Sequence, residues 1–126
     1  SIQLQPYSSV GEGEMDISGP FIQSINTDGP NRLWVGTWAA GLNELVTKPE
    51  QPDSFKIRHH LANDDNAPGG YSLNSNKIMF TFRDRSKVLW VGTGSSLEKA
   101  APYPWKFENQ HSRFEHLSPY NQTMRR

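Results

Sequence analysis

The sequence predicts an all-β fold: a β-propeller segment with two four-stranded antiparallel blades and a flanking strand. The first observation is a repeat, because the pentapeptide Leu-Trp-Val-Gly-Thr occurs at residues 33–37 and again at residues 89–93. The second is that four short apolar segments separated by turn residues fill each repeat, which is a signature of a propeller blade. The third is that no window shows the apolar spacing of an amphipathic helix.

The repeat extends well beyond the pentapeptide. Trp34 and Trp90 are 56 residues apart, and the same offset relates Asp28 to Asp84. We expect these two Asp residues to lie in turns, because an Asp side chain can accept hydrogen bonds from the backbone just downstream. The chain is therefore a repeat protein or a piece of one.

The expected strands follow from the apolar segments between turns. In the first unit they are residues 21–26, 32–37, 41–46 and 55–61, and in the second unit residues 77–82, 88–93, 97–101 and 113–117. A polar connector at residues 48–54 and a more aromatic one at residues 102–112 precede the last strand of each unit. We expect four parts: a leading edge strand and loop at 1–14, blade one at 15–61, blade two at 62–117, and a tail at 118–126.

The two faces of the pentapeptide strand have different expected contacts. Alternate residues of a strand face opposite sides of the sheet, so Trp34 and Gly36 share a face. We expect Trp34 and Trp90 to fill the gap to an adjacent blade. Gly36 and Gly92, on the same face, would permit a close approach by that blade.

Composition limits the kinds of partner. Thirteen basic and thirteen acidic residues balance, and no basic stripe stands out, so nucleic acid and anionic membranes are poor candidates. No apolar run approaches the roughly 18 residues of a membrane span. Cysteine is absent, which excludes disulfides and thiolate chemistry. The chain begins at Ser1 without a signal-like segment, and we expect it to be a piece of a longer protein.

Several motifs match a known bacterial repeat in both units. In the second unit they are residues 72–76 (Ser-Leu-Asn-Ser-Asn), Ile78, Asp84, residues 89–93 and Leu97, and in the first unit Ile22, Ile25, Asp28, residues 33–37 and residues 41–43. This signature resembles the two-component regulator propeller repeat, which forms the periplasmic sensor regions of hybrid histidine kinases. The match covers about residues 15–117. It is loose at residues 16–20 and at the turn of residues 85–87.

The resemblance implies a non-catalytic module that senses a ligand in the bacterial periplasm as part of an inner-membrane sensor. Relatives of this kind detect extracellular ligands, often polysaccharide fragments, so an oligosaccharide is the expected ligand and no cofactor is expected. Two alternatives stay open: a scaffold propeller of a polysaccharide-processing enzyme, and a purely structural propeller fragment. The sequence assigns no catalytic, ligand-binding or metal-binding residue.

Two blades cannot close a ring, since propellers have about four to eight. Uncapped terminal repeats leave apolar sheet faces uncovered. We therefore expect either self-association or the remaining blades of a parent protein to cover them, with residues 2–7 completing a neighbouring blade as its outer strand.

Candidate sites were weighed against simpler structural roles. His59 and His60 are adjacent on a strand, point to opposite faces and cannot share a metal ion; His111 and His116 belong to the other unit. The cluster of Asn63, Asp64, Asp65 and Asn66 has oxygen ligands that suit Ca²⁺ but lacks the regular spacing of a calcium loop. A turn-rich loop is the favoured interpretation.

Three further patterns carry little functional weight. Glu12 and Glu14 lie in one Gly-rich loop, whereas glycosidase carboxylates are held across a cleft. The sequon at Asn121 is expected to be accidental. The alternating aromatics Tyr103, Trp105 and Phe107 can stack on sugar rings or pack against a blade, and packing is favoured.

Overall fold

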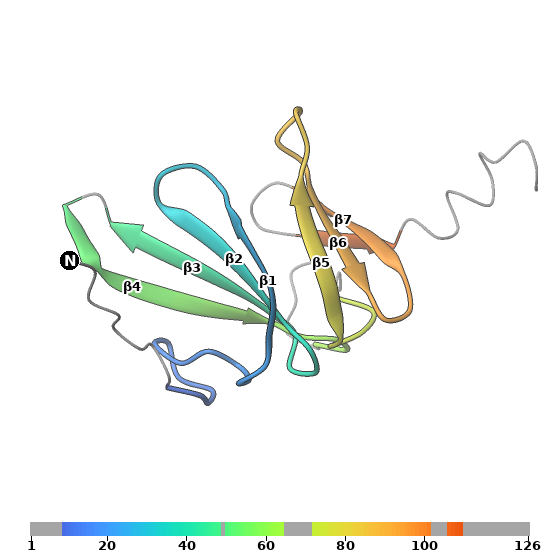
Figure 1. The fold of residues 1–126 in the computed structure, drawn as a ribbon, viewed down its shortest axis with the longest axis horizontal. Coiled ribbons are helices and arrows are strands. Elements are labelled where there is room, and N and C mark those ends of the chain that lie inside the picture. Colours follow the sequence, from blue (N-terminus) through green and yellow to red (C-terminus); the bar gives the residue numbers. More distant parts are fainter. Residues whose placement is uncertain (1–8, 49, 65–71, 102–105, 110–126) are drawn as a thin grey trace, which may run out of the picture.

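The computed structural model describes residues 9–48, 50–64, 72–101 and 106–109. These residues form eight β-strands and no helix, arranged in two four-stranded antiparallel sheets (Figure 1). Each sheet follows the order of the chain, so every strand pairs with its sequence neighbours through short connections. The prediction of an all-β chain with two four-stranded antiparallel sheets is confirmed. Within the described residues, no helix is long and apolar enough to cross a membrane.

Each sheet occupies one sequence unit. The first sheet contains β1 (Ile22–Thr27), β2 (Arg32–Thr37), β3 (Leu42–Lys48) and β4 (Gln51–His60). The second sheet contains β5 (Ile78–Arg83), β6 (Leu89–Thr93), β7 (Leu97–Ala101) and β8 (Lys106–Asn109). The first sheet thus lies inside residues 15–61 and the second inside residues 62–117.

The fourth strand of the second sheet differs from the prediction. Strand β8 begins at Lys106, inside the segment expected to be a connector, while residues 113–117 lie outside the described residues, as do residues 2–7. The physical reason is Phe107, which pairs with Ala100 on β7 and is buried. The first sheet shows the same trend, because β4 begins at Gln51 and takes up much of the expected connector at residues 48–54.

The sequence repeat is also a repeat of hydrogen bonds. The indole Nε1 of Trp34 donates to Asp28 Oδ2 at 3.0 Å, and that of Trp90 donates to Asp84 Oδ2 at 2.8 Å. Both strand pairs also carry an irregularity at the same place, between Ile22 and Ser24 in one sheet and between Ile78 and Phe80 in the other. The two pentapeptides are therefore equivalent members of equivalent sheets.

The core lies between the sheets. Strand β5 packs against β1 and β2, which places the inner strands of the two sheets side by side (Figure 1). The buried apolar cluster draws on both sheets and on the loop between them: Trp34, Leu42, Leu73, Ile78, Leu89, Val91, Ala100 and Phe107. A side chain at Gly36 would overlap Ile78, so this glycine permits the expected close approach. The Asn26 amide spans the same interface and donates to the Thr81 hydroxyl at 2.6 Å.

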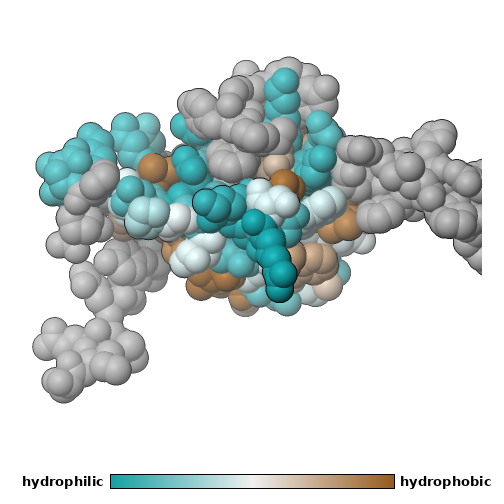
Figure 2. All heavy atoms as spheres, turned by 90° about the horizontal axis from the view of Figure 1, so that it is seen from above, coloured by the Kyte–Doolittle hydropathy of each residue, from teal (hydrophilic) through white to brown (hydrophobic). Residues whose placement is uncertain are grey.

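Each sheet keeps one face that no other described strand covers. On the second sheet Phe80 and Phe82 are 48% and 57% exposed, and on the first sheet Ile25 is 60% exposed. Trp90 is half-buried, whereas its equivalent Trp34 is fully buried beneath the second sheet. In Figure 2 hydrophobic residues form patches along the lower edge and smaller ones elsewhere, with hydrophilic residues across the middle of the view.

Candidate functional site: a basic pocket beside a buried charge cluster

A buried acid lies on the face of the first sheet that meets the second. Glu44 follows Leu42 by two residues on β3, so both side chains point toward the inter-sheet core. Its register partners are Trp34 on β2 and Arg58 on β4. The side chain of Glu44 is only 1% exposed, and an ionised carboxylate at such a position requires compensating charge.

Three cationic or protonatable groups supply that compensation, and together with Glu44 they form what we call the charge cluster. Arg32 Nε lies 2.8 Å from Glu44 Oε2, His60 Nε2 lies 3.0 Å from Oε1, and Arg58 Nη1 lies 3.6 Å from Oε1. Burial by itself would raise the pKa of Glu44. The hydrogen bond and charge of His60, with the charges of the two arginines, outweigh burial and hold this pKa below its ordinary value.

The charge cluster is joined to the second sheet through His60. Its ring lies 5.6 Å from the ring of Trp34, centre to centre, in a tilted arrangement. It also meets Phe107 of β8 edge-on, with the ring centres 5.1 Å apart. His60 therefore packs between the sheets while its Nε2 contacts the carboxylate.

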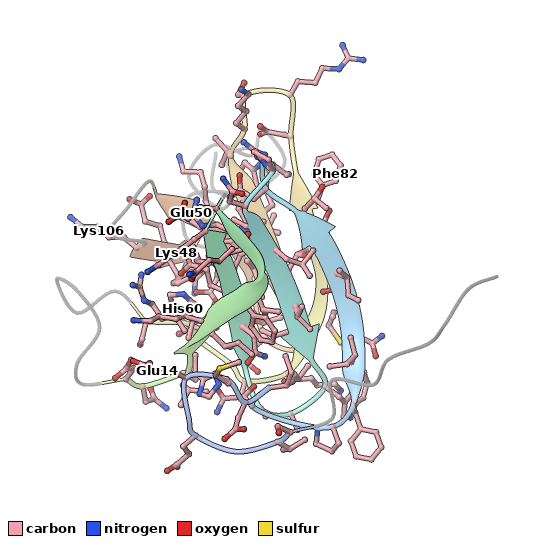
Figure 3. The ribbon with its side chains drawn as sticks, turned by 90° about the vertical axis from the view of Figure 1, so that its left-hand side faces the viewer. Glu14, Lys48, Glu50, His60, Phe82 and Lys106 are labelled. Atoms are coloured by element: carbon pink, nitrogen blue, oxygen red, sulfur yellow. The ribbon has the colours of Figure 1, made fainter. Side chains whose placement is uncertain are left out.

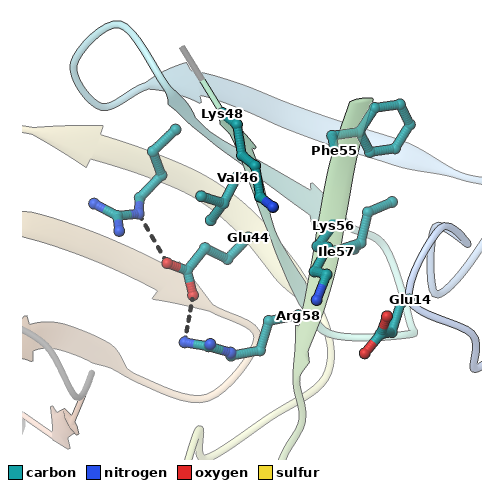
Figure 4. A pocket seen from close by; sticks show the side chains of 9 residues that line it. Glu14, Glu44, Val46, Lys48, Phe55, Lys56, Ile57 and Arg58 are labelled. Atoms are coloured by element: carbon teal, nitrogen blue, oxygen red, sulfur yellow. Dashed lines mark hydrogen bonds and ion pairs between the residues drawn. The ribbon is translucent and has the colours of Figure 1, made fainter. Parts of the chain in front are cut away.

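A pocket of about 560 Å³ adjoins the charge cluster and extends around the edge strand β4 (Figure 4). Its lining combines four cationic side chains, two acidic ones and three apolar ones: Arg32, Lys48, Lys56, Arg58, Glu14, Glu44, Val46, Phe55 and Ile57. We call it the basic pocket. Figure 3 shows Lys48, His60 and Glu14 on one side of the molecule and Phe82 on the other.

The segment before β1 contributes one wall of the basic pocket. The backbone N–H of Ile57 donates to the Glu14 carbonyl at 2.5 Å, so this loop runs beside β4. His59, which faces away from the charge cluster, contacts the Asp16 carbonyl through Nε2 at 2.6 Å. The loop containing Glu14 is thus fastened to the strand that carries Lys56 and Arg58.

A second buried acid, Glu98 on β7, has a different environment. Its Oε2 accepts hydrogen bonds from the Asn74 backbone N–H at 2.9 Å and from the Ser96 hydroxyl at 3.2 Å. Its Oε1 is buried without a hydrogen-bond partner among the described residues. Burial outweighs the two hydrogen bonds and raises the pKa of Glu98. At the equivalent place in the first sheet, the neutral Asn43 side chain accepts from the Ser18 backbone N–H at 3.0 Å.

Comparison with known proteins adds no assignment. No protein-family model matches this sequence, and no curated protein matches it significantly.

The histidines considered as metal ligands do not come together in the described parts of the structure. His59 and His60 contact groups on opposite faces of the first sheet, as predicted. Within the described parts of the chain, no group of three or more His, Cys, Asp or Glu residues could hold a metal ion. His111 and His116 lie outside the described residues, and so does Asn121.

Of the other residues considered from the sequence, those that the structure describes lie in a turn, on an exposed loop and in the core. Asn63 adopts a left-handed backbone conformation with φ of 57°, as in a turn, while Asp65 and Asn66 lie outside the described residues. Glu12 is exposed on its loop and does not line the basic pocket, whereas Glu14 does. Phe107 is 4% exposed in the core, so its packing interpretation is right and sugar stacking by this ring is excluded. Tyr103 and Trp105 lie outside the described residues.

Sequence reasoning missed the charge cluster. Its members stand at residues 32, 44, 58 and 60, on three strands, and only the pairing register brings them together. The sequence did contain a signal. Arg32 stands two residues before Trp34 on β2, and Glu44 stands two residues after Leu42 on β3, so each charged side chain shares a sheet face with a core residue. Charged residues at positions that share a face with a core Trp indicate a buried ion pair.

Proposed function

We propose that this chain is a ligand-sensing segment of a β-propeller in the periplasmic region of a two-component sensor, and that its ligand is an oligosaccharide. The observation that carries the proposal is the repeated packing unit. Trp34, Asp28 and Gly36 form a surface that receives Ile78 of the next sheet. Trp90, Asp84 and Gly92 repeat these residues on the far side of the second sheet, where the Phe80 ring lies over Gly92. A unit that packs one face against the preceding unit and carries the same residues on its other face can be stacked repeatedly, and propeller blades are stacked in this way around an axis.

The basic pocket supports the ligand-sensing part of the proposal. It is a cavity lined by four cationic side chains, which are hydrogen-bond donors, and by the apolar side chains of Val46, Phe55 and Ile57. This is the usual make-up of a small-molecule site. It also lies next to the charge cluster, which touches both sheets through His60. A ligand in the basic pocket would therefore contact Glu44, which is paired with His60, the group that joins the two sheets.

The uncovered sheet faces support a partner. We propose that further blades cover them, supplied by a second copy of the chain or by the rest of a parent protein. The uncovered face of the first sheet presents Ile22, which is 45% exposed, at the position equivalent to Ile78. The uncovered face of the second sheet presents Phe80 and Phe82, and the Phe80 ring lies over Gly92, the equivalent of Gly36.

Calorimetric titration of the chain with a panel of neutral and acidic oligosaccharides tests the function. Binding of at least one oligosaccharide, recovered chemically unchanged after incubation, is the expected result. Shortened products would favour the alternative of an enzyme scaffold, and no binding across the panel would overturn the sensing function.

A further inference from the structure

We infer that the basic pocket takes an anionic sugar, one whose carboxylate or sulfate group lies among Lys48, Lys56 and Arg58. The sugar part of this inference rests on the proposed function, while the anionic part rests on the pocket itself. The lining holds four cationic side chains against two acidic ones, which leaves an excess of two positive charges in a chain whose net charge is zero. The excess is therefore local to this pocket.

The contacts that Glu44 makes within the charge cluster determine which arginines of the pocket can also contact a ligand. Glu44 is ionised at neutral pH because its pKa lies below the ordinary range. It holds Arg32 through a 2.8 Å ion pair, which fixes one wall of the pocket. Arg58 Nη1 lies 3.6 Å from the same carboxylate, and its side chain is 54% exposed. Arg58 can thus contact Glu44 and a ligand at the same time.

Lys48 and Lys56 provide the outer cations. Both are exposed and both line the pocket, Lys48 from the end of β3 and Lys56 from β4, where it pairs with Val46. Figure 4 shows these two side chains around the same opening as Arg58. A planar guanidinium beside two ammonium groups suits a carboxylate or sulfate, because hydrogen bonds between charged groups are about twice as strong as neutral ones.

The apolar part of the lining identifies the rest of the ligand. Val46 lies on the same face of the first sheet as Lys56 and Arg58, whereas Phe55 and Ile57 line the pocket from the opposite face of the edge strand β4. An inorganic anion has nothing to place against this apolar surface, whereas an oligosaccharide can hold its acidic group at the cations and extend around β4 to pack the C–H face of a ring on Phe55. The combination therefore favours a ring that carries an acidic group over a simple ion.

The test is calorimetric titration of the whole chain with three oligosaccharides of equal length, one neutral, one containing uronic acid and one sulfated, and with inorganic sulfate. The pocket variant is Lys48→Gln/Lys56→Gln. The control variant, Arg85→Gln/Lys87→Gln, removes the same charge from exposed positions in the β5–β6 turn. Unfolding curves of both variants establish that they are folded.

We expect an acidic oligosaccharide to bind the wild-type chain, more weakly as salt is raised, and the pocket variant to weaken binding about tenfold or more. The control variant should change binding by less than about twofold. The uronate and sulfate arms distinguish the two sources of negative charge. Equal binding of the neutral sugar, or no effect of the pocket variant, would overturn the anionic inference and leave oligosaccharide sensing intact. Lysine-dependent binding of sulfate without binding of any sugar would retain the anion site and overturn the proposed function.

Discussion

Gly36 of β2 lies directly against the Ile78 side chain of β5, and a Cβ at Gly36 would also overlap the Ser24 hydroxyl. The pentapeptide therefore contains glycine at this position because the neighbouring sheet occupies the space of a side chain. Gly92 holds the equivalent position in the second sheet, where the Phe80 ring covers it instead. The two glycines thus form a matched pair with different neighbours.

The first prediction uses that pair. Gly36→Ala should destabilise the chain by roughly 1–3 kcal/mol, because the new methyl group forces the two sheets apart at a packed contact. Gly92→Ala should cost clearly less, since the Phe80 side chain is 48% exposed and can swing away. Urea unfolding of both variants measures the difference, and equal costs would contradict the assigned packing.

The second prediction concerns Glu44. Its pKa is lowered in the folded chain, so ionised Glu44 stabilises the fold above the ordinary value of 4.5, and this contribution is lost as pH falls through the folded pKa. Glu44→Gln should therefore destabilise the chain at pH 7 by about 2–4 kcal/mol and flatten the acid part of the stability profile. Urea unfolding between pH 7 and the acid limit checks this. A variant with the acid sensitivity of the wild-type chain would show that another carboxylate is responsible.

The third prediction concerns Glu98, whose pKa shifts in the opposite direction to that of Glu44. The pKa of Glu98 is raised, so the folded chain holds this proton more tightly than the unfolded chain. Its contribution to stability is greatest below the ordinary value of 4.5 and falls as pH rises through the folded pKa. Glu98→Gln keeps an acceptor for the Asn74 N–H and removes the buried ionisable group, so it should stabilise the chain at pH 7 on the order of 1 kcal/mol. The same unfolding experiment at pH 7 and pH 4 measures it, and a loss of stability at pH 7 would contradict the assignment.

The fourth prediction concerns the uncovered faces. If a second copy covers them, light scattering should give a mass above the 14.3 kDa of one chain, increasing with concentration. Phe82→Lys changes a side chain that is 57% exposed on the uncovered face and should return the mass to one chain. Lys87→Glu, a change at an exposed turn residue, is the control and should leave the mass unaltered. A single-chain mass for the wild type at all concentrations would mean that a second copy does not provide the cover.

Individual residues show which features of the fold could be predicted from the sequence. The period of 56 residues located Trp34 and Trp90, and each indole has the same Asp partner in the structure. Alternation correctly separated His59 from His60. The last strand of the second sheet was misplaced because Arg113–Leu117 matches the repeat, whereas Phe107 pairs with Ala100 and fills the core. The position of so short a strand depends on whether its one buried side chain, here Phe107, reaches the core.

The sequence by itself determined the all-β class, the two sheets and the turns, because these depend on alternation, on turn residues and on a repeat that local order expresses. Only the tertiary structure decided the contents of the sites. Glu44 is paired with Arg32, Arg58 and His60, whereas Glu98 is buried with no cationic partner in the part of the chain that the structure describes. The reason is that charge compensation depends on distances between strands, and the register that sets those distances emerges only when the sheets form and pack.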